Sequence, residues 1–281
     1  MSNTRKIKRV VAGQNAVDGA GVSLMRVFGY HDVKDFDPFL MLDAFDSSNS
    51  ADYVKGFPWH PHRGIETVTY LLEGEIDHGD NLGNAGIIGA GDCQWMTAGS
   101  GILHQEMPQE SPRLFGAQLW LNLPAKDKMT VPKYHDIKAE KIPVIEEENA
   151  KIRIISGEYK SQKGATTGEH VQATYLDVEI AADAKWTFEL PANDTLFVYI
   201  LQGEGNFEKE NDDMLGEKRA VLFFAGEHLF VHSGKSGVRF LLVSAKPLKE
   251  PIAWGGPIVM NTQEELDKAF EELNDGSFIK K

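Results

Sequence analysis

Two short motifs in the first half of the chain carry residue types that can bind a metal ion. They are His60-x-His62 and His104-x-Glu106, and a strand-like segment, a glycine-rich region and a second strand-like segment lie between them. Side chains at positions i and i+2 of a strand face the same side of a sheet. His60 and His62 therefore point together, as do His104 and Glu106, and we predict that the two pairs meet around one ion.

Such a site offers three imidazole nitrogens and one carboxylate oxygen. This set suits a first-row ion such as iron, and zinc, copper, nickel or manganese can also occupy it. Four protein ligands on an octahedral ion leave two positions for water, dioxygen or substrate. One carboxylate against a divalent cation leaves a net positive charge, which favours an anionic oxygen ligand.

Glu66 is a further candidate, because it shares the parity of His60 and His62. We expect the Glu66 carboxylate either to bind the metal as a fifth ligand or to contact one of the residues that bind it. We rank Glu106 above it as the ligand, since Glu106 lies two residues from His104 on the same expected strand.

The alternative is that these side chains are solvated or hydrogen-bonded residues on unrelated strands. A single His-x-His motif leaves that alternative open, whereas the second motif beyond the glycine-rich region favours a metal site. Among the other histidines, His78 with Asp80 is the best candidate for a secondary role near the rim of a barrel. The rest, which have no partner of matching spacing, are His31, His135, His170, His228 and His232.

The motifs need strands to position them, and the surrounding sequence is typical of strands. Residues 67–72 are rich in β-branched and aromatic side chains. Similar segments follow the same pattern at residues 22–28, 94–97, 103–107 and 116–123. Five glycines between residues 79 and 91 predict hairpins and tight corners. Short strands separated by turn signals indicate a sandwich or a barrel.

The composition narrows the classes of function. The 281 residues include 42 acidic and 29 basic side chains, for a formal charge of -13, which opposes direct binding to nucleic acid or anionic lipid. Cys93 is the one cysteine, so an internal disulfide and thiolate clusters are excluded and a reducing compartment is indicated. No apolar run approaches a signal peptide or a membrane span. We expect a cytoplasmic protein and a monomer.

Two domains are expected, with a boundary in the proline- and lysine-rich stretch 124–150. The first, residues 1–135, would hold the metal, and the second, residues 136–281, would lack the ligands. The sequence YLLEGE at residue 70 returns as YILQGE 129 residues later, which suggests two copies of one barrel. A capping box at Thr262 and apolar residues at helical spacing predict a C-terminal helix that ends before Gly276.

Longer stretches of the sequence resemble the pirin family. The two motifs are similar to the paired motifs of cupins, except that Thr97 stands where proline is usual and the gap to His104 is longer, as pirins show. The segments DPFLMLDAF at residue 37, HPHRGIETVTY at residue 60, QWMTAGSGILH at residue 94 and GPIVMNT at residue 256 also look like pirin sequence. The resemblance spans essentially the whole chain.

This resemblance implies an all-β fold of two tandem cupin barrels of the jelly-roll type, with a short C-terminal helix. It implies one metal ion, usually Fe²⁺, on His60, His62, His104 and Glu106. It also implies an oxidoreductase of the quercetin 2,3-dioxygenase type, in which a flavonol and O₂ are the substrates. Glu106 or Glu66 would be the catalytic base.

Two other functions remain open. One is a binding protein that senses redox state through its iron and regulates a protein partner, as a transcriptional or metabolic co-regulator. The other is a zinc cupin isomerase acting on sugars, which would need basic residues near the barrel mouth, and only Arg63 and Arg113 are close in sequence.

Overall fold

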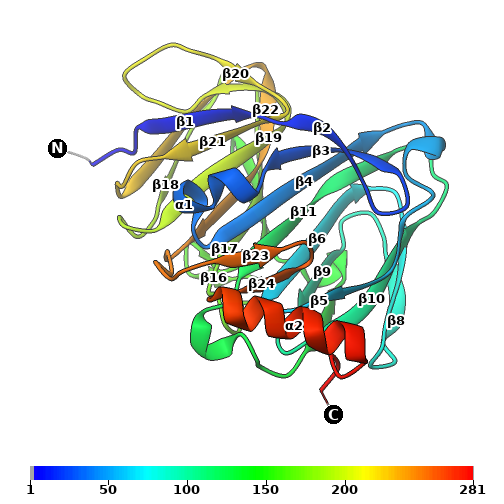
Figure 1. The fold of residues 1–281 in the computed structure, drawn as a ribbon. Coiled ribbons are helices and arrows are strands. Elements are labelled where there is room, and N and C mark those ends of the chain that lie inside the picture. The colour runs from blue at the N-terminus through cyan, green and yellow to red at the C-terminus, as the bar shows by residue number, and fades with distance from the viewer. Residues whose placement is uncertain (1–2, 281) are drawn as a thin grey trace. The chain divides into compact units, whose positions relative to one another are not determined.

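The structure is a computed structural model that describes residues 3–280 and consists mainly of strands (Figure 1). Its residues divide into two compact units. The first, here called the histidine unit, comprises residues 14–139 and 248–281 and contains both predicted motifs. The other, called the second unit, comprises residues 1–13 and 140–247. The prediction of an all-β chain with a C-terminal helix is confirmed.

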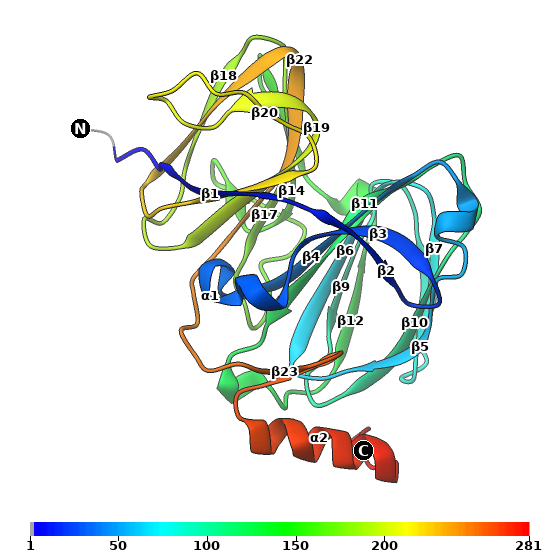
Figure 2. The same ribbon diagram turned by 45° about the horizontal axis from the view of Figure 1, so that its top comes forward.

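The histidine unit contains two antiparallel sheets, which form two walls in Figure 2. Along the seven-stranded sheet the order is β12 (Lys133–Ile137), β9 (Cys93–Thr97), β6 (Ile65–Glu73), β11 (Leu114–Asn122), β4 (Phe39–Ser47), β3 (Val22–Phe28) and β2 (Gln14–Asp18). Along the four-stranded sheet it is β5 (Phe57–His62), β10 (Ile102–Pro108), β7 (Ile76–Asp80) and β8 (Ala85–Ile88). These strands contain the predicted segments 22–28, 67–72, 94–97 and 103–107, and β11 contains residues 116–122 of the predicted segment 116–123.

Short helical turns and the C-terminal segment complete this unit. The turns are η1 (Tyr30–Asp32), α1 (Val33–Phe36), η2 (Ser50–Asp52) and η3 (Ala125–Asp127), and the chain enters the second unit through η4 (Ala139–Lys141). The C-terminal segment forms the hairpin β23 (Ala253–Gly255) and β24 (Ile258–Met260), followed by α2 (Gln263–Asp275).

Two apolar clusters of buried side chains make up much of the core between the sheets of the histidine unit. One contains Leu24, Phe45, Leu71 and Ile76, and the other contains Leu40, Ile65, Met96 and Trp120. Burial of such side chains contributes roughly 1.5–3 kcal/mol each relative to leaving them exposed. The strands that carry the histidines are therefore held by packing on strands of both sheets.

The second unit is built on one nine-stranded sheet. Its main path runs β1 (Ile7–Ala12), β21 (Arg219–Phe223), β19 (Thr195–Asn206), β22 (His228–Ala245), β17 (Thr174–Ile180), β14 (Ala150–Ser156) and β13 (Val144–Glu146). Off this path, β18 (Lys185–Glu189) pairs with β22, and β20 (Leu215–Gly216) pairs with β19. Strands β15 (Glu158–Tyr159) and β16 (Gln162–Lys163) form a separate two-stranded sheet. Its core is apolar and aromatic, with Trp186, Phe207 and Phe240 in contact.

The division into units differs at both ends from the predicted domains 1–135 and 136–281. Strand β1 pairs with β21, so residues 3–13 lie in the second unit. Helix α2 buries Leu266 and Ala269 against Ile258 and Met260 of β24, so the C-terminal helix lies in the histidine unit. Both differences arise from pairing between segments far apart in the sequence, which local patterns do not encode.

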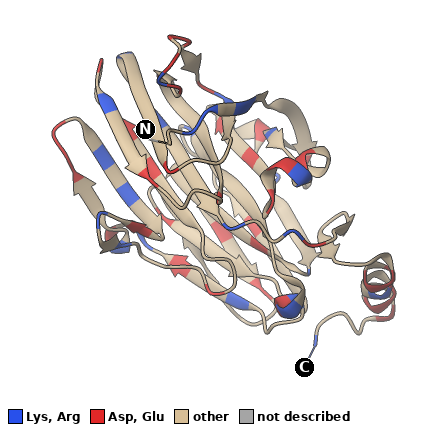
Figure 3. Cartoon of the chain, turned by 90° about the vertical axis from the view of Figure 1, so that its left-hand side faces the viewer, with Lys and Arg blue, Asp and Glu red and all other residues tan. Residues whose placement is uncertain are grey.

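Helix α2 has the ends that the sequence predicted. The Thr262 hydroxyl accepts a hydrogen bond from the Glu265 N–H at 3.2 Å, and the Glu265 carboxylate accepts one from the Thr262 N–H at 3.1 Å. Gly276 ends the helix with a φ of 80°. Many of its other side chains are acidic (Figure 3). In the part of the chain that the structure describes, no helix has the length and apolarity needed to cross a membrane.

Candidate metal centre

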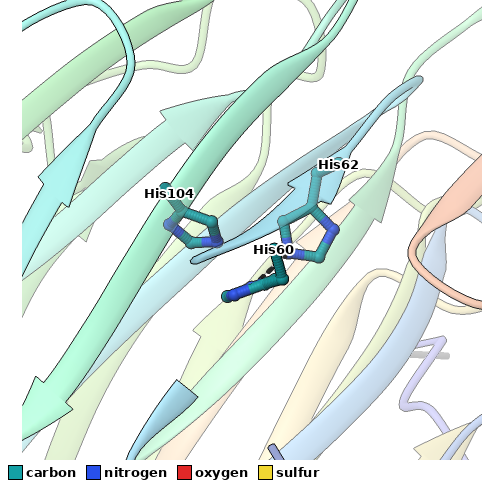
Figure 4. Close-up of side chains that lie close together, drawn as sticks. All are labelled: His60, His62 and His104. Carbon is teal, nitrogen blue, oxygen red and sulfur yellow. Dashed lines mark hydrogen bonds between the residues drawn. The ribbon is translucent and has the colours of Figure 1, made fainter. Parts of the chain in front are cut away.

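The two histidine motifs lie on neighbouring strands. His60 and His62 are on β5, and His104 is on β10, where it lies directly opposite His60 in the antiparallel pairing. The three rings approach one another (Figure 4), with centroids 4.3 to 5.0 Å apart. Their possible ligand atoms all lie within 4.8 Å of one another. The structure thus brings together three of the four predicted ligands.

A backbone carbonyl orients each of the two rings on β5. Nδ1 of His60 lies 2.9 Å from the carbonyl oxygen of Pro58, and Nδ1 of His62 lies 3.1 Å from that of Pro257. Because a carbonyl oxygen only accepts hydrogen bonds, each Nδ1 is assigned the proton and each Nε2 a lone pair. The two Nε2 atoms face each other at 3.1 Å. Two lone pairs at that distance repel each other unless a cation lies between them.

This separation fits two ligands of one ion. A metal–nitrogen bond of about 2.1 Å and a right angle at the metal place two nitrogen ligands about 3.0 Å apart. Burial lowers the pKa of His62 to about 3, and the neighbouring His60 acts in the same direction. The neutral imidazole is the form that binds a metal.

His104 gives independent evidence for a missing partner. Its side chain is fully buried, and within residues 3–280 neither ring nitrogen has a hydrogen-bond partner. A buried polar group without a partner costs about 1–3 kcal/mol. Burial, and then the neighbouring His62, His60 and His78, hold its pKa well below the usual value. A metal ion would give one of these two nitrogens a partner and would leave the imidazole neutral.

Glu106 is buried on β10, two residues beyond His104, and is held by side chains of the seven-stranded sheet. The Gln118 side-chain amide donates to Oε1 at 3.0 Å and to Oε2 at 2.8 Å, and the Thr69 hydroxyl donates to Oε1 at 3.0 Å. The compact group of ligand atoms in the described residues contains the three histidines and not this carboxylate. Glu106 therefore faces the predicted side, but its oxygens are engaged by Gln118 and Thr69.

Glu66 lies away from this group. On β6 it alternates with Thr67 and Thr69, and the Thr69 side chain reaches Glu106. Because neighbouring residues of a strand face opposite sides, the Glu66 carboxylate lies on the other face of the sheet, where it accepts a hydrogen bond from the Thr97 hydroxyl at 2.7 Å. Its placement therefore argues against the expected roles of fifth ligand and catalytic base.

His78 and Asp80, which were proposed together for a secondary role, have different surroundings in the structure. His78 is buried on β7 opposite Glu106, stacks on Tyr134, and lies 3.2 Å from a carboxylate oxygen of Asp136. Asp80 instead accepts hydrogen bonds from the backbone of residues 82 and 84, so it stabilises the turn between β7 and β8. His78 remains near the site, and Asp80 has a structural role.

Sequence comparisons place the chain in a family. The family model described as Pirin matches residues 21–121, and the model described as Pirin C-terminal cupin domain matches residues 175–279. The chain belongs to the pirin family. The predicted fold of two cupin domains is confirmed with it.

One relative and two solved structures match most of the chain. A pirin-like protein of Caulobacter vibrioides is 42% identical over 277 residues, which cover 98% of this chain and 99% of that protein. The crystal structure named quercetin 2,3-dioxygenase from Acinetobacter baumannii has a TM-score of 0.88 and 34% identity over 98% of both chains. A bacterial pirin of Escherichia coli in complex with nickel(II) has a TM-score of 0.67 and 18% identity, covering 85% of this chain and 99% of that one.

Several groups around this pirin site were missed from the sequence. Gln118 and Thr69 hold Glu106, Trp120 packs edge-on against His62 with ring centroids 4.9 Å apart, and the Pro257 carbonyl orients the same histidine. Gln118 is a polar residue in the middle of a mostly apolar strand, and that contrast could have marked it. The role of Pro257 depends on a backbone atom, for which the sequence carries no signal.

Proposed function

We propose that the chain is an iron-dependent dioxygenase of the quercetin 2,3-dioxygenase type, which cleaves a flavonol with O₂. The observation that carries this proposal is the pair of Nε2 lone pairs of His60 and His62, which face each other. Beside them lies the ring of His104, which has no hydrogen-bond partner among the residues that the structure describes. The likeness to a structure named quercetin 2,3-dioxygenase gives the proposed reaction. The net reaction incorporates both atoms of O₂ and releases carbon monoxide.

His60, His62 and His104 would hold the metal, with Glu106 as the fourth ligand once its carboxylate turns toward the histidines. A bound redox-active divalent ion supplies Lewis acidity toward the flavonol oxygens and one-electron chemistry toward dioxygen. One carboxylate and three neutral imidazoles leave positive charge at the site, which favours a deprotonated hydroxyl as the incoming ligand.

Glu106 is also the proposed base for the flavonol 3-hydroxyl. Its Oε1 atom accepts hydrogen bonds from both Thr69 and Gln118, whereas Oε2 accepts from Gln118 alone. Oε2 therefore has the greater capacity to accept a proton.

The identity of the metal is part of the proposal. A pirin of Escherichia coli has been crystallised with nickel(II), and the ligand set of three nitrogens and one oxygen accommodates nickel as well as iron. We propose iron because it changes readily between Fe²⁺ and Fe³⁺, which allows one-electron chemistry with dioxygen.

Oxygen uptake with quercetin tests the proposal. Metal-free protein would be loaded without air with Fe²⁺, Ni²⁺ or Zn²⁺, its metal content measured, and oxygen and carbon monoxide followed after quercetin is added. We expect uptake and carbon monoxide with Fe²⁺, loss of both in His62→Ala, and retention in the matched control His135→Ala, which changes an exposed histidine outside the site. Iron-loaded protein that consumes no oxygen with quercetin would refute the proposed activity.

A further inference from the structure

A row of aromatic side chains leads from the candidate metal centre to the surface of the histidine unit. The Trp120 ring of β11 lies against His62 with centroids 4.9 Å apart. Trp254 of β23 follows at 6.0 Å from Trp120, and Tyr30 of η1 follows at 5.6 Å from Trp254. Trp120 is 8% exposed and Tyr30 is 61% exposed, so the row passes from the interior to solvent.

Each step of this row is a direct ring contact. Contacting aromatic pairs have centroids about 4.5–7 Å apart, and all three separations fall in that range. Tryptophan and tyrosine are the aromatic side chains most easily oxidised by one electron, and electron transfer between touching rings is fast. Both indole N–H groups donate hydrogen bonds, that of Trp120 to Gln118 Oε1 at 3.2 Å and that of Trp254 to the Gly256 carbonyl at 2.7 Å. These acceptors stabilise an indole that has lost an electron.

Packing alone accounts for only part of the row. Trp120 belongs to a cluster of buried apolar residues, and Trp254 packs against that cluster while half-buried. Tyr30 buries little of its side chain, so its apolar contact contributes little to stability. The outward end of the row therefore has no explanation in core packing.

We propose that Trp120, Trp254 and Tyr30 form a one-electron path between His62 and the surface, which carries oxidising equivalents away from the metal centre when no substrate is bound. The proposal rests on the metal site of the proposed function. With a peroxide as oxidant, H₂O₂ gains two electrons and two protons and becomes two waters. An Fe²⁺ ion held by the three histidines would supply one electron and become Fe³⁺. The other comes from Tyr30, which loses its phenolic proton to solvent and becomes a neutral radical.

Peroxide treatment without quercetin tests this path. Iron-loaded protein of measured iron content would be mixed with H₂O₂, frozen rapidly for electron paramagnetic resonance, and digested to map oxidised residues by mass spectrometry. We expect a tyrosyl radical and oxidation of Tyr30 in the wild type. Tyr30→Phe should lose the radical, and Trp254→Phe, which keeps an aromatic ring that is hard to oxidise, should reduce Tyr30 oxidation several-fold.

Two controls make the result specific. Trp254→Tyr restores an oxidisable ring and should restore Tyr30 oxidation, whereas Trp59→Phe changes an exposed tryptophan outside the row and should have no effect. Thermal unfolding of each variant checks that the fold is kept. Equal oxidation of Tyr30 in Trp254→Phe and in the wild type would overturn the proposal, as would oxidation confined to the histidines and Trp120.

The outcome is separable from that of the proposed function. Oxygen uptake with quercetin is measured on the same preparations, and we expect Trp254→Phe and Tyr30→Phe to keep the wild-type initial rate. Normal uptake together with unchanged Tyr30 oxidation in Trp254→Phe overturns the path alone. A tyrosyl radical that depends on Trp254 supports the path even where quercetin is not consumed.

Discussion

The Nε2 atoms of His60 and His62 lie 3.1 Å apart, while the Nδ1 atom of each ring faces a backbone carbonyl oxygen. This pairing fixes the tautomers and leaves two lone pairs directed at one point. The arrangement is unfavourable for two neutral side chains alone and favourable for two ligands of a cation. It also makes the C-terminal segment part of the site, because the carbonyl that orients His62 belongs to Pro257.

Arg63 fastens that segment to the strand that carries His62. Its guanidinium donates to the Ser100 and Phe278 carbonyls at 2.8 and 2.7 Å and to the Glu272 carboxylate at 2.7 Å. Arg63→Met should lower the free energy of unfolding by about 3 kcal/mol, as loss of one partner of a buried ion pair does. Urea denaturation measures this change.

Lys280→Met is the matched control for Arg63→Met, because Lys280 pairs with the same Glu272 carboxylate at 2.6 Å but is partly exposed. Its loss should cost no more than about 1 kcal/mol. Equal destabilisation by the two substitutions would show that Arg63 does not hold the segment.

Gln118 should control metal affinity through Glu106. Replacing it by leucine removes both hydrogen bonds from the amide to the carboxylate. Loss of a group that orients a ligand typically weakens metal binding about 10–100-fold. Calorimetric titration of Gln118→Leu with Ni²⁺ measures the effect, with Gln109→Leu as the control at a glutamine that contacts Asp77 instead. An unchanged affinity in Gln118→Leu would indicate that Glu106 is not a ligand.

The stability of the metal-free protein should depend on the protonation of His62. Its pKa of about 3 in the folded chain lies below the value of about 6.5 expected when it is unfolded. The unfolded chain therefore binds more protons between these pH values, and the free energy of unfolding should fall as the pH decreases from about 6.5 toward 3.

One such group contributes a slope of up to about 1.4 kcal/mol per pH unit. His62→Gln removes this group, so the free energy of unfolding of this variant should fall less steeply as the pH decreases. His135→Gln is the control. Denaturation in urea across this pH range gives the slopes. A slope in His62→Gln as steep as in the wild type would contradict the lowered pKa.

The sequence predicted that the three histidines lie together, because residues i and i+2 of a strand face the same side and the two strands that carry them are neighbours. The same reasoning failed for Glu66, since parity holds only within one strand. The chain turns at Gly64, which has a φ of 76°, and β5 and β6 belong to different sheets. The alternation of side-chain direction along β5 therefore does not continue into β6. Helix α2 was predictable because its cap and apolar spacing are local.

The partners of the site were harder to foresee. The Arg63 side chain meets Glu272 across 209 residues, and β1 pairs with a strand more than 200 residues away. Contacts of this kind depend on the whole topology and leave no periodic signal. The placement of α2 beside the histidine motifs therefore needed the structure.

The most direct test is the binding of one divalent ion by the three histidines. Metal-free protein would be titrated without air with Fe²⁺, and with Ni²⁺ as a stable substitute, in an isothermal calorimeter. We predict one ion per chain in the wild type and in His135→Ala, and loss of binding in His104→Ala. A wild type that binds no ion, or a His104→Ala variant that binds as tightly as the wild type, would contradict the assignment of this site.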